Sequence, residues 1–254
     1  MFMNPLPRLR LHQPLAILLG ACLTIAVGVQ PLRGASLHYL SAGQPDSARL
    51  LAPPPLPDSA EQAADMATVV AVCRACSTNA AALAFGEKRF SIYNFTPALG
   101  ERLKPGKLPK TEAFFERLQK DAAAATDEAK DYWKRPRPFT VNPSLASGKL
   151  EKSFGYPSGH ACEGMVLALV LAELFPDQSE AVLAIGRDLG WHRVWIGRHY
   201  PTDIYAGRVF ALAIVREMKA SPDFQRDLAE VKAEIVTTVA NGGTRDQTPA
   251  PATR

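Results

Sequence analysis

An all-α fold, organised as a single-domain helical bundle over residues 37–240, is what this sequence predicts. Apolar residues recur at helical spacing, and the alternating pattern of a strand is absent over any useful length. Prolines and capping residues stand where helices are expected to begin. The chain has 254 residues, of which 47% are hydrophobic and 21% charged, which suits a globular domain with a substantial core.

The first 36 residues are expected to be a signal peptide, with the protein exported to the periplasm. Arg8 and Arg10 precede an apolar run from Leu15 to Val29, which is the pattern of a secretory signal. The cleavage site stays open between the small residues around 26–28 and those around 34–36. Two alternatives remain, a lipoprotein acylated at Cys22 and an uncleaved membrane anchor.

The first half of the domain is expected to start with a proline-rich extended arm over residues 37–58. A capping box at Ser59–Gln62 then predicts a helix to about Ala82, and Thr111 is expected to cap a second helix over residues 112–130. Between these helices, the expected core residues are Phe85, Phe90, Ile92, Tyr93 and Phe95.

The second half is expected to contain a loop followed by four helices. The loop covers residues 139–156, and the central helix runs from Ala161 to Phe175. The later helices are expected over residues 180–197, 201–220 and 222–239, and a polar tail over residues 241–254 is expected to be disordered.

Charge and cysteine content exclude several classes of function. The net charge of +4 is too small, and too little clustered, to predict nucleic-acid binding. No apolar segment after the signal has the length of a membrane span, so we expect no membrane contact in the mature form unless Cys22 is lipidated. Cys73 and Cys76 form an isolated CxxC, for which buried thiols or a disulfide are simpler interpretations than a metal site. No metal site and no cofactor are predicted.

A basic segment follows the predicted helix that ends near residue 130. Guanidinium groups fit pairs of phosphate oxygens, and an ammonium adds a point charge. Taken alone, a solvated charge cluster explains the segment more simply. Its cationic residues are Lys130, Lys134, Arg135 and Arg137.

A tight turn over residues 155–160 brings a histidine to the start of the central helix. The first turn of a helix has free N–H groups and a positive dipole end, which together can hold an anion. Ser158 and Gly159 would offer a hydroxyl and a backbone amide there, and His160 a titratable proton. Alone, an ordinary helix start with a surface histidine explains the turn equally well.

A histidine and an aspartate lie four residues apart at the start of a later helix. A carboxylate at Asp203 can bind one ring nitrogen of His199, which leaves the other nitrogen free to attack. Arg193 can face the same pocket from the preceding helix. The simpler alternative is a capping pair beside an exposed arginine. Together, however, the three segments provide cations, a nucleophile and an acid for phosphoryl transfer without a metal.

These motifs resemble the signature of the type 2 phosphatidic acid phosphatase and vanadium haloperoxidase superfamily, Lys-x6-Arg-Pro, Pro-Ser-Gly-His and Arg-x5-His-x3-Asp. The first motif starts at Lys130 and ends at Arg137-Pro138, since Glu128 lies seven residues before the competing Arg135. The signal, the length and the helical pattern resemble the class A bacterial non-specific acid phosphatases.

The resemblance implies a role for each matched residue. His199 would be the nucleophile that forms a phosphohistidine, Asp203 would orient it, and His160 would protonate the leaving alcohol. The phosphate-binding groups would be Lys130, Arg137, Ser158, Gly159 and Arg193. The family often has serine where this chain has His192, and we expect that side chain to face the core.

The resemblance implies that the substrates are small phosphate monoesters and that vanadate inhibits by mimicking phosphate. Within the superfamily, the alternatives are a vanadate-dependent haloperoxidase and a lipid phosphatase. A non-catalytic phosphate-binding protein is the alternative from another class. The sequence leaves the physiological substrate and the formation of a homo-oligomer open.

Overall fold

The computed structural model describes residues 37–243, which lie in one compact unit, with side chains described to residue 238. This part of the chain contains helices and no strands, which confirms the all-α prediction. The signal peptide predicted over residues 1–36 lies outside the described residues. The α-helices are α1 (Ser47–Leu50), α2 (Ala60–Ala75), α3 (Thr78–Gly86), α4 (Thr96–Leu99), α5 (Pro109–Trp133), α6 (Pro138–Val141), α7 (Gly159–Leu174), α8 (Ser179–Trp195), α9 (Pro201–Ala220) and α10 (Pro222–Gly243).

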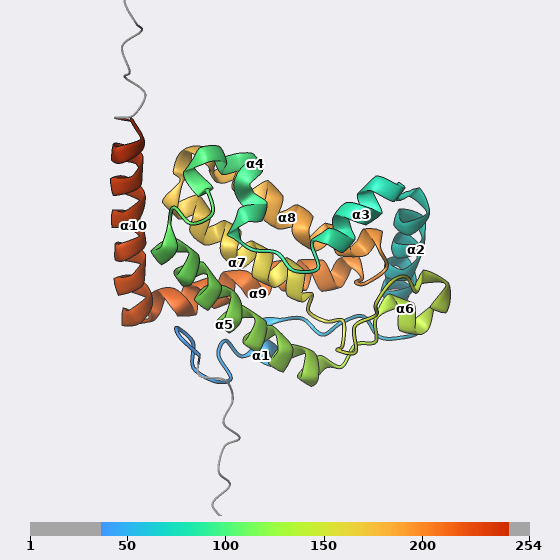
Figure 1. Ribbon diagram of the computed structural model, residues 1–254. Helices are drawn as coiled ribbons and strands as arrows, with labels where there is room; N and C mark the ends of the chain where they lie inside the picture. Colours follow the sequence, from blue (N-terminus) through green and yellow to red (C-terminus); the bar gives the residue numbers. More distant parts are fainter. Residues whose placement is uncertain (1–36, 244–254) are drawn as a thin grey trace, which may run out of the picture. The chain divides into compact units, whose positions relative to one another are not determined.

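The central helix of the bundle is α7, which packs against α5, α8 and α9 (Figure 1). Apolar residues cover nearly its whole circumference, as expected for a helix enclosed by neighbours. Gly186 of α8 lets two of these helices approach closely, since a Cβ there would lie 2.5 Å from the Cβ of Ala168. The core therefore fixes the position of α7 relative to α8.

The N-terminus of α7 lies wedged between α8 and α9. A Cβ at Gly190 of α8 would lie 2.7 Å from the Cβ of Ala161, and a Cβ at Gly207 of α9 would lie 2.7 Å from the carbonyl oxygen of Ser158. The backbone N–H of Ser158 also donates to the carbonyl oxygen of Asp203 over 3.0 Å. Two glycines thus let the turn that begins α7 meet the first turn of α9.

The N-terminal arm is fastened to α5 by a buried carboxylate. Asp121 accepts backbone hydrogen bonds from His38, Tyr39 and Leu40, at 2.7 to 3.1 Å. The arm was predicted to be extended throughout, but it contains the short helix α1, which Asp46 caps. Its proline-rich part, residues 52–56, is free of helix.

The helix predicted from Ser59 to Ala82 is two helices. Its start is as expected, since the Ser59 hydroxyl accepts from the N–H of Gln62. However, α2 ends at Ala75, and the Ser77 hydroxyl caps α3 by accepting from the N–H of Ala80 over 3.2 Å. A serine can satisfy the free amides of a new helix start, so the chain turns by 112° here instead of continuing.

Other boundaries differ from the predictions by a few residues. Pro109, and not Thr111, begins α5, because proline suits the first helical position; Thr111 lies inside the helix and binds Glu234. The predicted loop 139–156 contains most of α6 and a 3₁₀ turn at Pro143–Leu145. Phe85 was expected in the core but is 39% exposed, and α10 continues to Gly243, past the predicted end of the domain at 240.

Within the described part of the chain, no single helix has both the length and the apolar character to cross a membrane. The bent pair of α2 and α3 meets these criteria only when the two helices are taken together.

Candidate active site

His199 lies two residues before α9, against a carboxylate of the first turn of that helix. Its Nδ1 is 3.2 Å from Oδ2 of Asp203, which also accepts from the N–H of Tyr200 over 2.9 Å. Its Nε2 is 3.1 Å from Nη1 of Arg137. Because a carboxylate accepts and a guanidinium donates, the ring is neutral, with its proton on Nδ1 and its lone pair on Nε2. This is the tautomer that a nucleophilic imidazole needs.

Burial and neighbouring charge set the protonation of this pair. Burial lowers the pKa of His199 well below its usual value, and the charges of Arg137, Lys130 and Arg193 lower it further. Burial raises the pKa of Asp203 to about 6, although Arg135 opposes this rise. A neutral His199 beside a carboxylate can attack an electrophile without first losing a proton.

The three predicted cations all come close enough to influence His199, and each is held by protein oxygens. Lys130, near the end of α5, forms an ion pair of 2.7 Å with Asp127. Arg137 donates to the carbonyl oxygens of Ser153 and Arg198. These contacts fix the ammonium and the guanidinium in place before any anion binds.

Arg193 and Gly159 complete the predicted set of phosphate ligands. Arg193, in the last turn of α8, donates to the carbonyl oxygen of Ala84 over 2.6 Å. A Cβ at Gly159 would lie 3.3 Å from Nζ of Lys130, so this glycine keeps the backbone of the first turn of α7 next to the ammonium. Ser158 is the N-cap residue of α7, and its hydroxyl accepts from the N–H of Ala161 over 3.4 Å.

His160 occupies a different environment, in the first turn of α7. Its Nε2 is 3.1 Å from the carbonyl oxygen of Glu87, and its ring packs against Phe90 at a centroid distance of 5.4 Å. Burial lowers its pKa to about 3, with further lowering by the charges of Arg193, His199 and Lys130. A dianionic phosphate among these cations would oppose their effect and favour the protonated ring.

We expected His192 to face the core, but its ring binds a carboxylate. Its Nδ1 is 2.8 Å from Oε2 of Glu87, and its ring stacks on Trp195 at a centroid distance of 4.0 Å. Glu87 therefore contacts two histidines, His160 through its backbone carbonyl and His192 through its carboxylate.

Two charged residues beside the site were missed from the sequence. Arg198 is 1% exposed, and its Nε is 3.1 Å from Oε2 of Glu151, whose Oε1 is 3.8 Å from Nη2 of Arg193. Glu151 lies in a segment that looked like an ordinary polar loop. Arg198 immediately precedes His199, but one arginine among several basic and aromatic neighbours gave no signal of its own.

Arg135, set aside in the sequence as the wrong register of the first motif, lies against the other oxygen of Asp203, with Nη1 2.5 Å from Oδ1. The sequence offered one signal for this second role, the alternation Arg-Pro-Arg-Pro. Its prolines disfavour a helix, so the two arginines are not expected to lie on one helical face.

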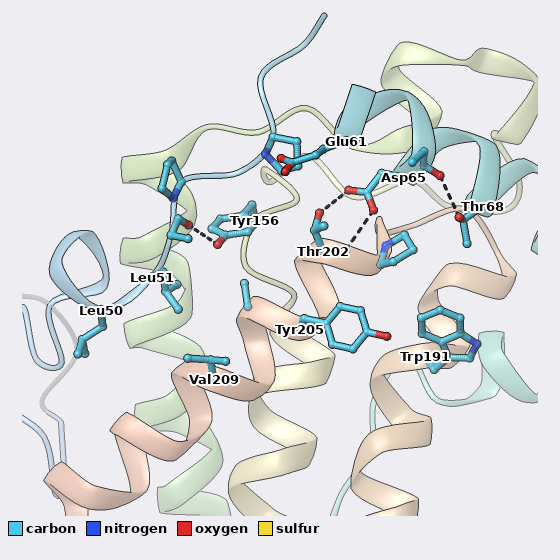
Figure 2. A pocket seen from close by; sticks show the side chains of 16 residues that line it. Leu50, Leu51, Glu61, Asp65, Thr68, Tyr156, Trp191, Thr202, Tyr205 and Val209 are labelled. Carbon is cyan, nitrogen blue, oxygen red and sulfur yellow. Dashed lines mark hydrogen bonds between the residues drawn. The ribbon is translucent and has the colours of Figure 1, made fainter. Parts of the chain in front are cut away.

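A cavity of about 820 Å³ lies beside this part of the molecule, between the N-terminal arm, α2 and α9 (Figure 2). Asp65 and Thr202 point toward one another in its wall and are joined by a hydrogen bond. The rest of its lining is largely apolar and includes Leu51, Tyr156 and Val209.

Residues 122–226 match the PAP2 superfamily. The matched range contains all three motifs and all eight predicted site residues. This match covers about two fifths of the chain, and this part of the chain is similar to PAP2 superfamily proteins. This confirms the resemblance that the motifs predicted.

Curated relatives of this chain are acid phosphatases. The chain is 34% identical to the non-specific acid phosphatases of Salmonella typhimurium, over 147 residues, and of Providencia stuartii, over 148 residues; each match covers 56% of this chain and 59% of the relative. The chain thus spans about three fifths of the length of these two relatives. An acid phosphatase of Zymomonas mobilis is 29% identical over 205 residues, which cover 77% of this chain and 78% of the relative.

Among solved structures, the chain is similar to a transmembrane PAP2 type phosphatidylglycerolphosphate phosphatase from Bacillus subtilis. The match has a TM-score of 0.45 and 19% identity, and covers 68% of this chain and 89% of that chain.

Two further findings concern groups that could bind a metal or form a disulfide. Among the described residues, no group of three or more His, Cys, Asp or Glu side chains is arranged to hold a metal ion. Cys73, Cys76 and Cys162 are free thiols, so the CxxC is not closed as a disulfide in this structure.

Proposed function

We propose that this protein is an exported, metal-independent acid phosphatase that hydrolyses small phosphate monoesters through a phosphohistidine at His199. The observation that carries the proposal is the state of His199, a neutral ring with Nδ1 on a carboxylate and Nε2 facing a guanidinium. The PAP2 match and the acid phosphatase relatives support the same chemistry.

In the first step, Nε2 of His199 attacks phosphorus in line with the leaving oxygen. The P–O bond to the alcohol breaks as the N–P bond forms, and the alcohol oxygen takes its proton from the His160 imidazolium. Lys130, Arg137 and Arg193 stabilise the negative charge on the phosphoryl oxygens. Asp203 stabilises the positive charge that develops on His199, as a carboxylate does beside any imidazole that becomes cationic.

In the second step, water attacks the phosphohistidine. The neutral His160 takes a proton from this water, the N–P bond breaks, and phosphate leaves with His199 neutral again. The same residue thus acts as acid and then as base, which restores the starting protonation after each turnover.

The remaining parts of the proposal rest on the sequence. Export rests on the apolar N-terminal segment, and vanadate is proposed as an inhibitor because it resembles the transferred phosphoryl group. The proposed partners include no nucleic acid. They include a membrane only if Cys22 carries a lipid in the mature form.

A panel of phosphate monoesters, assayed across pH with EDTA or vanadate added, tests this proposal. We expect hydrolysis that is fastest in acid, unaffected by EDTA and inhibited by vanadate, with a phosphoenzyme that is trapped by rapid quenching and is labile to acid. Restoration of a chelated enzyme by zinc would contradict the metal-free mechanism. Vanadate-dependent halide oxidation, or a strong preference for phosphatidate in detergent, would favour the alternative functions, and phosphate binding without turnover would indicate a binding protein.

A further inference from the structure

Arg135 lies at the centre of a buried polar cluster behind Asp203. Its side chain is 4% exposed, in the turn that follows α5. Its Nη1 donates to Oδ1 of Asp203 over 2.5 Å and to the hydroxyl of Thr202 over 2.6 Å. Its Nη2 donates to Oδ2 of Asp65 over 2.7 Å and to Oε1 of Gln62 over 2.6 Å. The guanidinium is thereby shared between two carboxylates on two different helices.

The face of the same guanidinium is also occupied. Its central carbon lies 4.1 Å from the ring centroid of Tyr200, at cation–π distance. Asp65 in turn accepts from the backbone N–H and the hydroxyl of Thr202, in the cavity wall shown in Figure 2. Arg135 is therefore held from its edges and from its face, and it has little freedom to rotate.

These contacts divide the two oxygens of Asp203 between different partners. Oδ1 is bound by Arg135, which leaves Oδ2 for Nδ1 of His199 and the N–H of Tyr200. A carboxylate held on one oxygen cannot turn away from the imidazole. Asp65, Arg135, Asp203 and His199 also form a row of alternating charge once His199 becomes cationic. Such a row favours the phosphohistidine state over the resting state.

We propose that Arg135, anchored by Asp65, is a positioning residue that holds Asp203 ionised and aims its Oδ2 at His199 during phosphoryl transfer. This proposal rests on the proposed function. Arg135 need not touch the substrate, because its hydrogen bonds end on Asp203, Thr202, Asp65 and Gln62.

A pH effect follows from the charged groups around Asp203. Arg135 and Arg137 both lower its pKa, while burial raises it to about 6. His199 faces its Oδ2, and Asp65 acts on it through Arg135. Lys130 and His160 interact with His199 through their charges. Loss of Arg135 would raise the pKa of Asp203, so Asp203 would become protonated at higher pH than in the wild type. The acid limb of the rate profile would then move upward.

The test compares Arg135→Gln with a matched control, Arg117→Gln. Arg117 resembles Arg135 in pairing with an aspartate, Asp227, over 2.9 Å and in lying over a tyrosine ring, Tyr39, at 6.0 Å. It belongs to the cluster that joins the N-terminal arm, α5 and α10, far along the bundle from the histidines. Loss of Arg117 should lower the melting temperature without changing the catalytic constants of the folded protein.

For Arg135→Gln we expect kcat to fall about 10²- to 10³-fold, with KM changed less than about threefold, because the lost interaction matters mainly in the transition state. The acid limb should move up by about one pH unit. Arg135→Lys should recover part of kcat, since an ammonium keeps the charge but binds fewer acceptors. Unchanged kcat and pH profile in Arg135→Gln, or the same changes in Arg117→Gln, would overturn the proposal.

Asp65→Asn provides a second variant that does not depend on Arg135→Gln folding. Without the Asp65 charge, Arg135 is held less firmly against Asp203 and lowers its pKa less, so the acid limb should move up by less than in Arg135→Gln, with kcat reduced less than about tenfold. A downward shift or an unchanged profile would contradict the anchoring role. An inactive wild type would instead reject the proposed function, so the two failures are distinguishable.

Discussion

The two histidines of the site differ in the groups that bind their ring nitrogens. His199 has a carboxylate on Nδ1 and a guanidinium at Nε2. His160 has a backbone carbonyl at Nε2 and packs against an aromatic ring. Burial is the largest cause of the lowered pKa of each ring. The charges of Arg193 and Lys130 lower the pKa of both rings, and Arg137 lowers that of His199 as well.

This difference separates their roles although their net charge environment is similar. A carboxylate stabilises a ring that gains lasting positive charge, which is what a phosphohistidine requires of His199. A carbonyl contact orients His160 but provides no full countercharge, so its proton is easily given up to a leaving group. The partner of each ring, more than its burial, therefore predicts its role.

Replacement of His199 should reduce turnover more than any other change to the two histidines and their partners. His199→Ala removes the atom that forms the bond to phosphorus, so turnover should fall by about 10⁴-fold or more for every substrate. Rapid-quench assays with labelled substrate should then detect no phosphoenzyme. A variant that keeps forming an acid-labile phosphoenzyme would show that the nucleophile is another residue.

Replacement of His160 should have an effect that depends on the leaving group. His160→Ala removes the proton donor, which should slow alkyl phosphates about 10²- to 10⁴-fold. Nitrophenyl phosphates should be slowed far less, because their leaving oxygen needs no proton. Equal losses on both kinds of substrate, or losses equal to those of His199→Ala, would contradict the separate roles.

Replacement of the carboxylate of Glu87 should have the smallest effect on activity and sharpens the same comparison. Glu87→Gln keeps the backbone carbonyl at His160, and it changes the contact with His192 and removes a negative charge that acts on Arg193. We expect kcat to change less than about threefold, since the affected hydrogen bond does not reach the reacting atoms. Asp203→Asn is the matched control and should reduce kcat about 10³-fold or more by removing the charge beside His199. Similar effects from both variants would show that His160 also depends on a carboxylate.

The sequence by itself determined the fold class and most boundaries of the long helices, and it predicted eight residues of the candidate site. Local signals were sufficient for this, because capping residues, prolines and helical periodicity act within a few residues of each other. The pairing of His199 with Asp203 was also local, since His199 lies two residues before α9 and Asp203 lies in its first turn. The break at Ser77 was missed although its hydroxyl is a local capping group, and the exposure of Phe85 was missed because burial depends on tertiary packing.

Only the tertiary structure decided which charged groups surround these residues. Arg135 comes from the end of α5, Asp65 from α2 and Asp203 from α9, so their contact depends on how three helices pack. The same holds for Glu87, which reaches His160 and His192 from the end of α3. Electrostatic contacts across 60 to 140 residues leave no fixed spacing in a sequence. Their physical cause is the packing of the core, in which small residues such as Gly190 and Gly207 let the helix ends converge.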